Sequence, residues 1–93
     1  MHKKFLKSVI SKIWVLVRQS TQETLELNQL DEIRQALMDI KTNWSQNDAY
    51  FQKALHLCDS VQKSGILSVT QRNTPEAQEI IDQCQNLMRY LDS

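Results

Sequence analysis

LDEIRQALMDIKTNW, residues 30–44, carries an apolar side chain at every third or fourth position. These positions are Leu30, Ile33, Leu37, Ile40 and Trp44. Alternating steps of three and four align the side chains along one face of an α-helix, which is typical of a helix packed nearly parallel to its neighbours. The stretch therefore predicts a helix that faces a core built with other helices.

Three further segments show helical periodicity. Residues 3–19 place one set of apolar side chains in a single arc at about 100° per residue, opposite lysines and serines. That set is Phe5, Leu6, Val9, Ile10, Ile13, Leu16 and Val17. Val15 falls on the polar side of this helix and Trp14 on its boundary. A third helix gains an apolar face from Tyr50, Phe51, Ala54, Leu57, Cys58 and Val61. A fourth gains one from Ala77, Ile80, Ile81, Cys84, Leu87, Met88 and Leu91.

The start of the second helix has two candidates. Ser20 and Glu23 have the spacing of a capping box, in which a hydroxyl and a carboxylate bind backbone amides at a helix start. Asn28 is the other candidate, because the regular apolar pattern begins only at Leu30. Residues 21–28 are therefore either helix or loop.

Turn-forming residues separate the second and third helices. Polar side chains that compete for backbone hydrogen bonds are concentrated at residues 42–48, where Ser45 and Asp48 are candidates to cap the third helix. Lys63 and Gly65 predict its end, since a basic last turn and a glycine stop are typical of helix C-termini.

The last helix has the clearest predicted boundary. Thr74, Pro75 and Glu76 have the order of an N-cap, a first-turn proline and an acid near the positive helix end. Residues 66–73 before it predict a loop. Four helices joined by short loops predict an all-α, antiparallel four-helix bundle that forms a single domain over residues 1–93.

Composition narrows the functional classes. The chain has 93 residues, one glycine and one proline, so it lacks glycines for a phosphate-binding loop or a nucleophile elbow. Its longest unbroken apolar run is the five residues 13–17, whereas a bilayer span needs about 20. Lys7 and Lys12 interrupt the apolar part of the N-terminus, which argues against a signal peptide. Two cysteines suit a reducing compartment.

No pattern indicates catalysis or metal binding. Cys58 and Cys84 fall on apolar helix faces and predict packing, although a disulfide or a reactive thiol remains an alternative. His56 and Cys58 point about 200° apart on one helix and cannot chelate one ion. A metal site or a Cys84–His56 pair across two helices is the third class of hypothesis. We expect no cofactor, no metal and no enzymatic activity.

The first helix is the candidate for a charged partner. Residues 1–20 carry five basic and no acidic side chains, whereas residues 21–93 carry six basic and eleven acidic ones. Anionic lipid headgroups attract lysines and the membrane interface favours tryptophan, so peripheral membrane association is one interpretation. The acidic remainder argues against nucleic acid. The alternative is that the helix is only part of the core. The candidate membrane-contact residues are Lys3, Lys4, Lys7, Lys12 and Trp14.

Three features of the sequence together resemble one protein family. They are the lysine-rich opening helix, the regularly spaced middle pair of helices, and a final helix that begins with Thr74-Pro75-Glu76-Ala77-Gln78. They resemble the small immunity proteins that protect producers of class II, pediocin-like bacteriocins, and the likeness covers nearly the whole chain. The resemblance implies a non-catalytic four-helix bundle in the cytoplasm, at the inner membrane face, that recognises the bacteriocin bound to its membrane receptor, the mannose phosphotransferase permease.

The resemblance also implies where the partner binds, because the C-terminal half sets specificity in that family. The implied recognition residues are Ile66, Leu67, Val69, Arg72, Gln78, Gln83, Gln85 and Arg89. For each of these polar residues a solvated helix face is the alternative interpretation. A second functional class is a helical protein–protein interaction module, an adaptor or secretion partner, that uses Trp14 and Val15 as leftover apolar surface.

Overall fold

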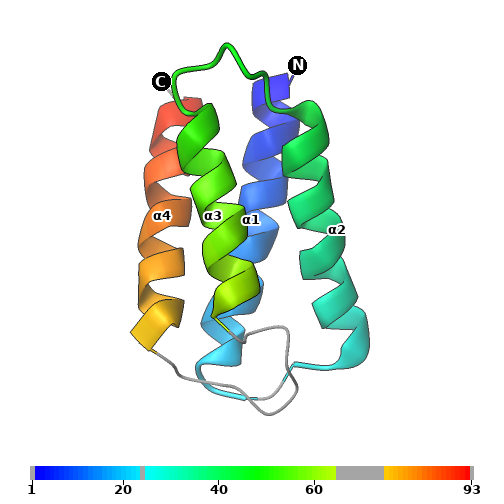
Figure 1. Ribbon diagram of the computed structural model, residues 1–93. Coiled ribbons are helices and arrows are strands. Elements are labelled where there is room, and N and C mark those ends of the chain that lie inside the picture. Colours follow the sequence, from blue (N-terminus) through cyan, green and yellow to red (C-terminus); the bar gives the residue numbers. More distant parts are fainter. Residues whose placement is uncertain (1, 24, 65–74, 93) are drawn as a thin grey trace.

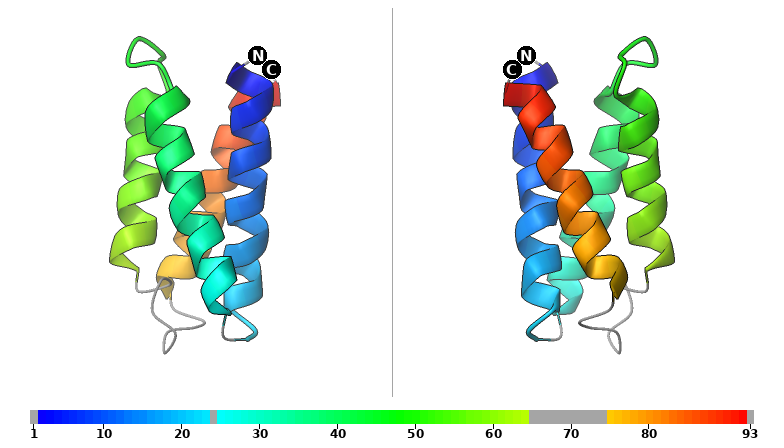
Figure 2. Two further views of the ribbon diagram at one scale, coloured as in Figure 1. Left: turned by 90° about the vertical axis from the view of Figure 1, so that its right-hand side faces the viewer. Right: turned by 90° about the vertical axis from the view of Figure 1, so that its left-hand side faces the viewer.

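The computed structural model describes residues 2–23, 25–64 and 75–92 (Figure 1). Within these ranges the protein is all-α, with helices α1 (His2–Ser20), α2 (Leu27–Asn43), α3 (Phe51–Lys63) and α4 (Pro75–Asp92). Successive helices run in opposite directions, and the two ends of the chain lie at the same end of the bundle (Figure 2). The expected antiparallel four-helix bundle is therefore confirmed.

Each helix packs against two others. In the described part of the chain α1 lies against α2 and α4, and α3 lies against α2 and α4, whereas the backbones of the diagonal pairs stay apart. The α2–α3 contact is the smallest of the four. The four apolar stripes meet in one core, and its largest side chains with under 2% exposure include Ile10, Ile13, Leu30, Ile33, Ile40, Leu57, Ile80 and Leu87. The periodicity of the sequence thus predicted which face of each helix is buried.

Phe5 is an exception to the predicted core. Its side chain is 45% exposed, although the arc of residues 3–19 included it. At about 100° per residue Phe5 stands at the margin of that arc, roughly 80° from its centre, so it lies outside the covered stripe. Val15 is 53% exposed, as its position on the polar side predicted.

The second helix begins at Leu27, one residue before the Asn28 candidate. The backbone N–H of Glu26 donates to Gln29 Oε1 at 2.8 Å, which fixes this start. The alternative start at Ser20 is wrong: Ser20 ends α1, is buried, and its Oγ donates to the Val17 carbonyl at 2.6 Å. A hydroxyl held inside α1 cannot cap the next helix.

Ser45 and Asp48, the candidate caps of the third helix, stabilise the turn between α2 and α3. Asp48 Oδ1 accepts the Tyr50 N–H at 2.7 Å, and Ser45 Oγ accepts the Asn47 N–H at 3.2 Å. Because α3 begins only at Phe51, Asp48 stabilises the turn before the helix and does not cap the helix itself. Gly65, the loop at 66–73 and Thr74 lie outside the described residues, and α4 begins at Pro75, as predicted.

Candidate functional site

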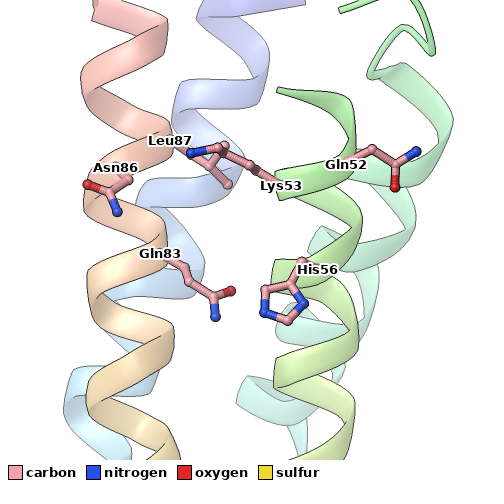
Figure 3. A pocket seen from close by; sticks show the side chains of 6 residues that line it. All are labelled: Gln52, Lys53, His56, Gln83, Asn86 and Leu87. Atoms are coloured by element: carbon pink, nitrogen blue, oxygen red, sulfur yellow. The ribbon is translucent and has the colours of Figure 1, made fainter. Parts of the chain in front are cut away.

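A groove between α3 and α4 is lined by two of the predicted recognition residues, Gln83 and Arg89. It consists of two adjoining pockets of about 310 Å³ and about 440 Å³, which share Lys53 and Asn86 in their linings. The first is lined by Gln52, Lys53, His56, Gln83, Asn86 and Leu87 (Figure 3). The second is lined by Tyr50, Lys53, Asn86, Arg89 and Tyr90. We call this surface the α3/α4 groove.

Gln83 and His56 face each other across the middle of the groove (Figure 3). The amide nitrogen of Gln83 donates to Ser60 Oγ at 3.2 Å and to Glu79 Oε1 at 3.3 Å. Its amide oxygen is buried and has no hydrogen-bond partner among the residues that the structure describes. The bond to the Glu79 carboxylate fixes which amide atom is the nitrogen, since a carboxylate needs a donor. The groove wall therefore contains one unsatisfied acceptor.

An aromatic pair closes the upper part of the groove, near the chain termini. The rings of Tyr50 and Tyr90 stack with centroids 3.9 Å apart. Lys53 Nζ lies 5.1 Å from the centroid of the Tyr50 ring, and Lys3 Nζ lies 5.2 Å from that of Tyr90. Cations at this distance over aromatic faces are attracted by the ring quadrupole. The pair thus joins α1, α3 and α4 at one end of the bundle.

Asp48 anchors the aromatic pair. Its Oδ2 accepts the Tyr90 hydroxyl at 2.7 Å. Burial favours a higher pKa for Asp48, but hydrogen bonds from the Tyr50 N–H, Tyr90 and Trp44, together with the charge of Lys3, outweigh it and lower the pKa below its ordinary value. The same hydrogen bond, with burial adding to it, raises the pKa of Tyr90. Asp48 is therefore a charged carboxylate that donors of the fold hold in place.

Two cations of the groove lack an acidic partner. No ion pair within the described residues involves Lys53 or Arg89, whereas Lys7 pairs with Asp92, Lys63 with Asp59 and Arg34 with Asp31. Lys53 extends from α3 across the groove toward Leu87 of α4 (Figure 3). Arg89 lines the groove from α4. The upper groove is therefore positively charged and open to an anionic group.

The remaining recognition candidates are not brought together. Gln78 is exposed on α4 and its Nε2 donates to Asp82 at 3.1 Å, which matches the solvated-face interpretation. Gln85 lines a separate shallow pocket with Met88, Arg89 and Asp92. Of the predicted residues, only Gln83 and Arg89 line the α3/α4 groove. Ile66, Leu67, Val69 and Arg72 lie outside the described residues.

The predicted membrane-contact residues divide into two groups. Lys3 is placed over the Tyr90 ring and Lys7 pairs with Asp92, so both are engaged with α4. Lys4 and Lys12 are exposed and make no ion pair in the part of the chain that the structure describes. Only these two lysines are available on the outer side of α1, which also carries the exposed Val15.

Trp14 packs against the core instead of projecting outward. Its side chain is partly buried, the Arg18 guanidinium lies 4.8 Å from its ring centroid, and its Nε1 is buried without a partner. A tryptophan that anchors a protein at a membrane interface exposes its polar edge. This packing leaves Val15 and Phe5 as the exposed apolar side chains of α1.

The cysteines pack in the core as free thiols. Burial raises the pKa of Cys58 to about 11 and that of Cys84 to about 12, and Cys58 adds to the shift of Cys84. In the described ranges, no three His, Cys, Asp or Glu side chains come together as ligands of a metal ion would. None of the helices, over the residues described, is long and apolar enough to cross a bilayer.

Comparisons of the chain with protein-family models, with curated proteins and with solved structures give no match. Its function therefore rests on its own residues and their geometry.

Lys53, Asn86 and the tyrosine pair were not among the predicted site residues. Tyr50 had been assigned to the apolar face of its helix, and Lys53, three residues later, lies at the edge of that face. The position of a residue at the margin of an apolar stripe is the signal that would have pointed to the groove.

Proposed function

We propose that the chain is a non-catalytic immunity protein that protects a bacteriocin producer by recognising a toxin-bound receptor at the inner, cytoplasmic face of the membrane. The observation that carries the proposal is the α3/α4 groove, because it offers two cations without ion-pair partners, Lys53 and Arg89, in the C-terminal half of a four-helix bundle. The resemblance to pediocin-type immunity proteins implies partner recognition in that half.

The second support is the outer face of α1. Lys4 and Lys12 are exposed there, and Val15, one helical turn after Lys12, has a side chain that is 53% exposed. Lysines next to an exposed apolar side chain favour weak, salt-sensitive attachment to anionic headgroups. A protein held at the membrane surface by α1 presents its other helices to a receptor in the same membrane.

A protection assay tests the proposal. The chain is expressed in a bacterium sensitive to pediocin-like peptides, which is then challenged with a panel of them. We expect growth in the presence of one peptide and inhibition by the others. A variant with Lys53→Glu and Arg89→Glu, expressed at the same level, should lose this protection. Inhibition by every peptide of the panel, at an expression level verified by immunoblot, would contradict the proposal.

The second candidate function is a protein–protein interaction module, and one observation favours it. Among the residues that the structure describes, four large apolar side chains are exposed: Phe5 (45%), Val15 (53%), Leu27 (70%) and Met38 (62%). They lie on two helices, α1 and α2, and interfaces of stable complexes cover such residues. This function predicts a stable complex with a partner and no protection in the assay above.

A further inference from the structure

We propose that the α3/α4 groove binds an acidic peptide segment of a protein partner. The inference rests on the proposed function, since it names the chemistry of the partner that this groove recognises. Three conditions must hold. The groove must have an excess of positive charge, its shape must accept side chains, and a peptide must match its charged and polar groups better than a simple anion does.

The charge excess follows from how the nearby carboxylates are occupied. Asp48 accepts hydrogen bonds from the Tyr90 hydroxyl and the Tyr50 N–H, and Glu79 accepts one from Gln83. Asp92, one helical turn beyond Arg89, pairs with Lys7. These acids keep their charge but are held by bonds within the fold, and none of them lines either pocket. Lys53 and Arg89 do line the groove and have no ion-pair partner among the described residues. An added carboxylate would contact two cations from different helices.

The lining provides apolar contacts below these charges. Leu87 forms part of the first pocket, and the stacked rings of Tyr50 and Tyr90 form part of the second. The two pockets, about 310 Å³ and about 440 Å³, adjoin at Lys53 and Asn86, so successive side chains of one segment can occupy them. The lining thus combines one leucine and two aromatic rings with mostly polar side chains, a mixture that suits a peptide segment.

The unsatisfied oxygen of Gln83 distinguishes a peptide from a phosphate. Gln83 Oε1 is buried without a partner and needs a donor. Six residues separate Gln83 from Arg89, so the acceptor and the cation stand about 9 Å apart along α4. A peptide carries both an acidic side chain and N–H donors over such a distance. The phosphodiester of an anionic lipid such as phosphatidylglycerol offers acceptors alone, and the donors of its headgroup, the two glycerol hydroxyls, lie closer than this to the phosphate.

Peptide display tests the inference with the purified full chain. A random 12-residue library is selected for binding, and enriched sequences are synthesised with a fluorophore and titrated by fluorescence anisotropy. We expect enriched peptides to contain Asp or Glu, and their affinity to fall as salt is raised. In the variant with Lys53→Glu and Arg89→Glu the Kd should rise about tenfold or more. A peptide whose acids are changed to Lys should bind that variant again.

The matched control carries the same charge change away from the groove. Lys4→Glu with Lys12→Glu alters two exposed cations of α1, and it should bind the acidic peptides with an unchanged Kd. A milder groove variant, Lys53→Gln with Arg89→Gln, keeps the result interpretable if charge reversal disturbs folding, and circular dichroism verifies the helix content of each variant. Gln83→Leu, which removes the unsatisfied oxygen, should weaken binding several-fold.

Three outcomes would overturn the inference. The first is a selection that enriches no acidic sequences, and the second is an equal loss of binding in the groove and control variants. The third is evidence for a lipid ligand. In that case the unchanged protein binds vesicles of phosphatidylglycerol and phosphatidylcholine, the variant with Lys53→Glu and Arg89→Glu does not, and the selection enriches no peptide. These outcomes are independent of the protection assay. Protection without peptide binding overturns this inference alone, and peptide binding without protection overturns the proposed function alone.

Discussion

Cys58 and Cys84 are both fully buried, and this burial determines their reactivity. A thiol with an ordinary pKa of 9.0 is partly thiolate at pH 8, but burial raises the pKa of Cys58 to about 11 and of Cys84 to about 12. The thiolate is the nucleophile, so these shifts lower the reactive fraction about 100-fold or more. We expect iodoacetamide to modify the native chain at least about 100-fold more slowly than the chain in urea.

Mass spectrometry of timed samples at pH 8 measures both rates. The matched control replaces exposed Ser8 by Cys in a chain with Cys58→Ala and Cys84→Ala, and its single thiol should react at the ordinary rate without urea. Rapid modification of native Cys58 or Cys84 would contradict the packing described above. It would also reopen the alternative that one of these thiols is functional.

Asp48 makes the stability of the bundle depend on pH. Its hydrogen bonds and Lys3 lower its pKa in the folded protein, outweighing burial, so the unfolded chain binds the proton more tightly. The stabilisation that the Asp48 carboxylate gives to the folded protein is therefore fully present above the ordinary pKa of 3.8. It is lost as the pH falls through the pKa that Asp48 has in the folded protein. Asp48→Asn should cost about 1 kcal/mol at pH 7, allowing for its partial exposure. This cost should shrink toward pH 3.

Urea unfolding of the unchanged protein and of the Asp48→Asn variant, at pH 7 and at pH 3, measures how the cost of the substitution depends on pH. Tyr90→Phe removes the donor to Asp48 Oδ2 and should raise the pKa of Asp48 toward its ordinary value in an NMR titration. A cost of Asp48→Asn that is equal at both pH values would show that the carboxylate charge is not what stabilises the turn.

At the level of elements, apolar periodicity predicted the faces of all four helices, and Pro75 predicted the start of α4. The start of α2 was harder. Ser20 is a preferred N-cap type, but burial at the end of α1 gives its hydroxyl the Val17 carbonyl as a partner. The actual cap position holds Glu26, a residue type that capping preferences do not favour. Local sequence therefore cannot decide between caps when tertiary burial reassigns a side chain.

The groove was only partly predictable for a related reason. Gln83 and Arg89 came from the outward positions of one helix, whereas the groove also needs Lys53 from α3 and Tyr50, the residue before α3. Which margins of two helices meet depends on how each is rotated about its axis. That rotation follows from side-chain packing across the whole core, which a single helical pattern does not contain.

Gln29 tests the corrected start of α2. Its Oε1 accepts the Glu26 N–H at 2.8 Å, and its Nε2 donates to Gln19 Oε1 of α1 at 3.2 Å. Gln29→Ala removes both bonds and should lower the free energy of unfolding by about 1 kcal/mol. Gln35→Ala is the matched control, because Gln35 is exposed on the same helix and its amide donates to Asp39 of that helix at 3.1 Å.

Thermal and urea unfolding followed by circular dichroism measures both variants. The control should change stability by no more than about 0.5 kcal/mol. Equal effects of the two substitutions would mean that the bonds of Gln29 do not stabilise the junction between α1 and α2.

For the molecule as a whole, the separation of charge along the sequence favours attraction between the basic first helix and the acidic remainder. The pair between Lys7 and Asp92, and the position of Lys3 over Tyr90 near Asp48, agree with that attraction. The fold therefore uses two of the lysines of α1 for packing against α4. It leaves Lys4 and Lys12 exposed for an external anion.

Because two lysines of α1 contact α4 and two are exposed, removing either pair of charges should have a different effect. Lys4→Gln with Lys12→Gln should reduce co-sedimentation with phosphatidylglycerol vesicles at low salt about fivefold or more, because each lysine near an anionic surface contributes about 1 kcal/mol. Its Tm should not change. Lys3→Gln with Lys7→Gln should keep the vesicle binding and lower the Tm by a few degrees, since it removes contacts between α1 and α4. Equal losses of vesicle binding in the two variants would show that the total charge of α1, and not its exposed face, attracts the membrane.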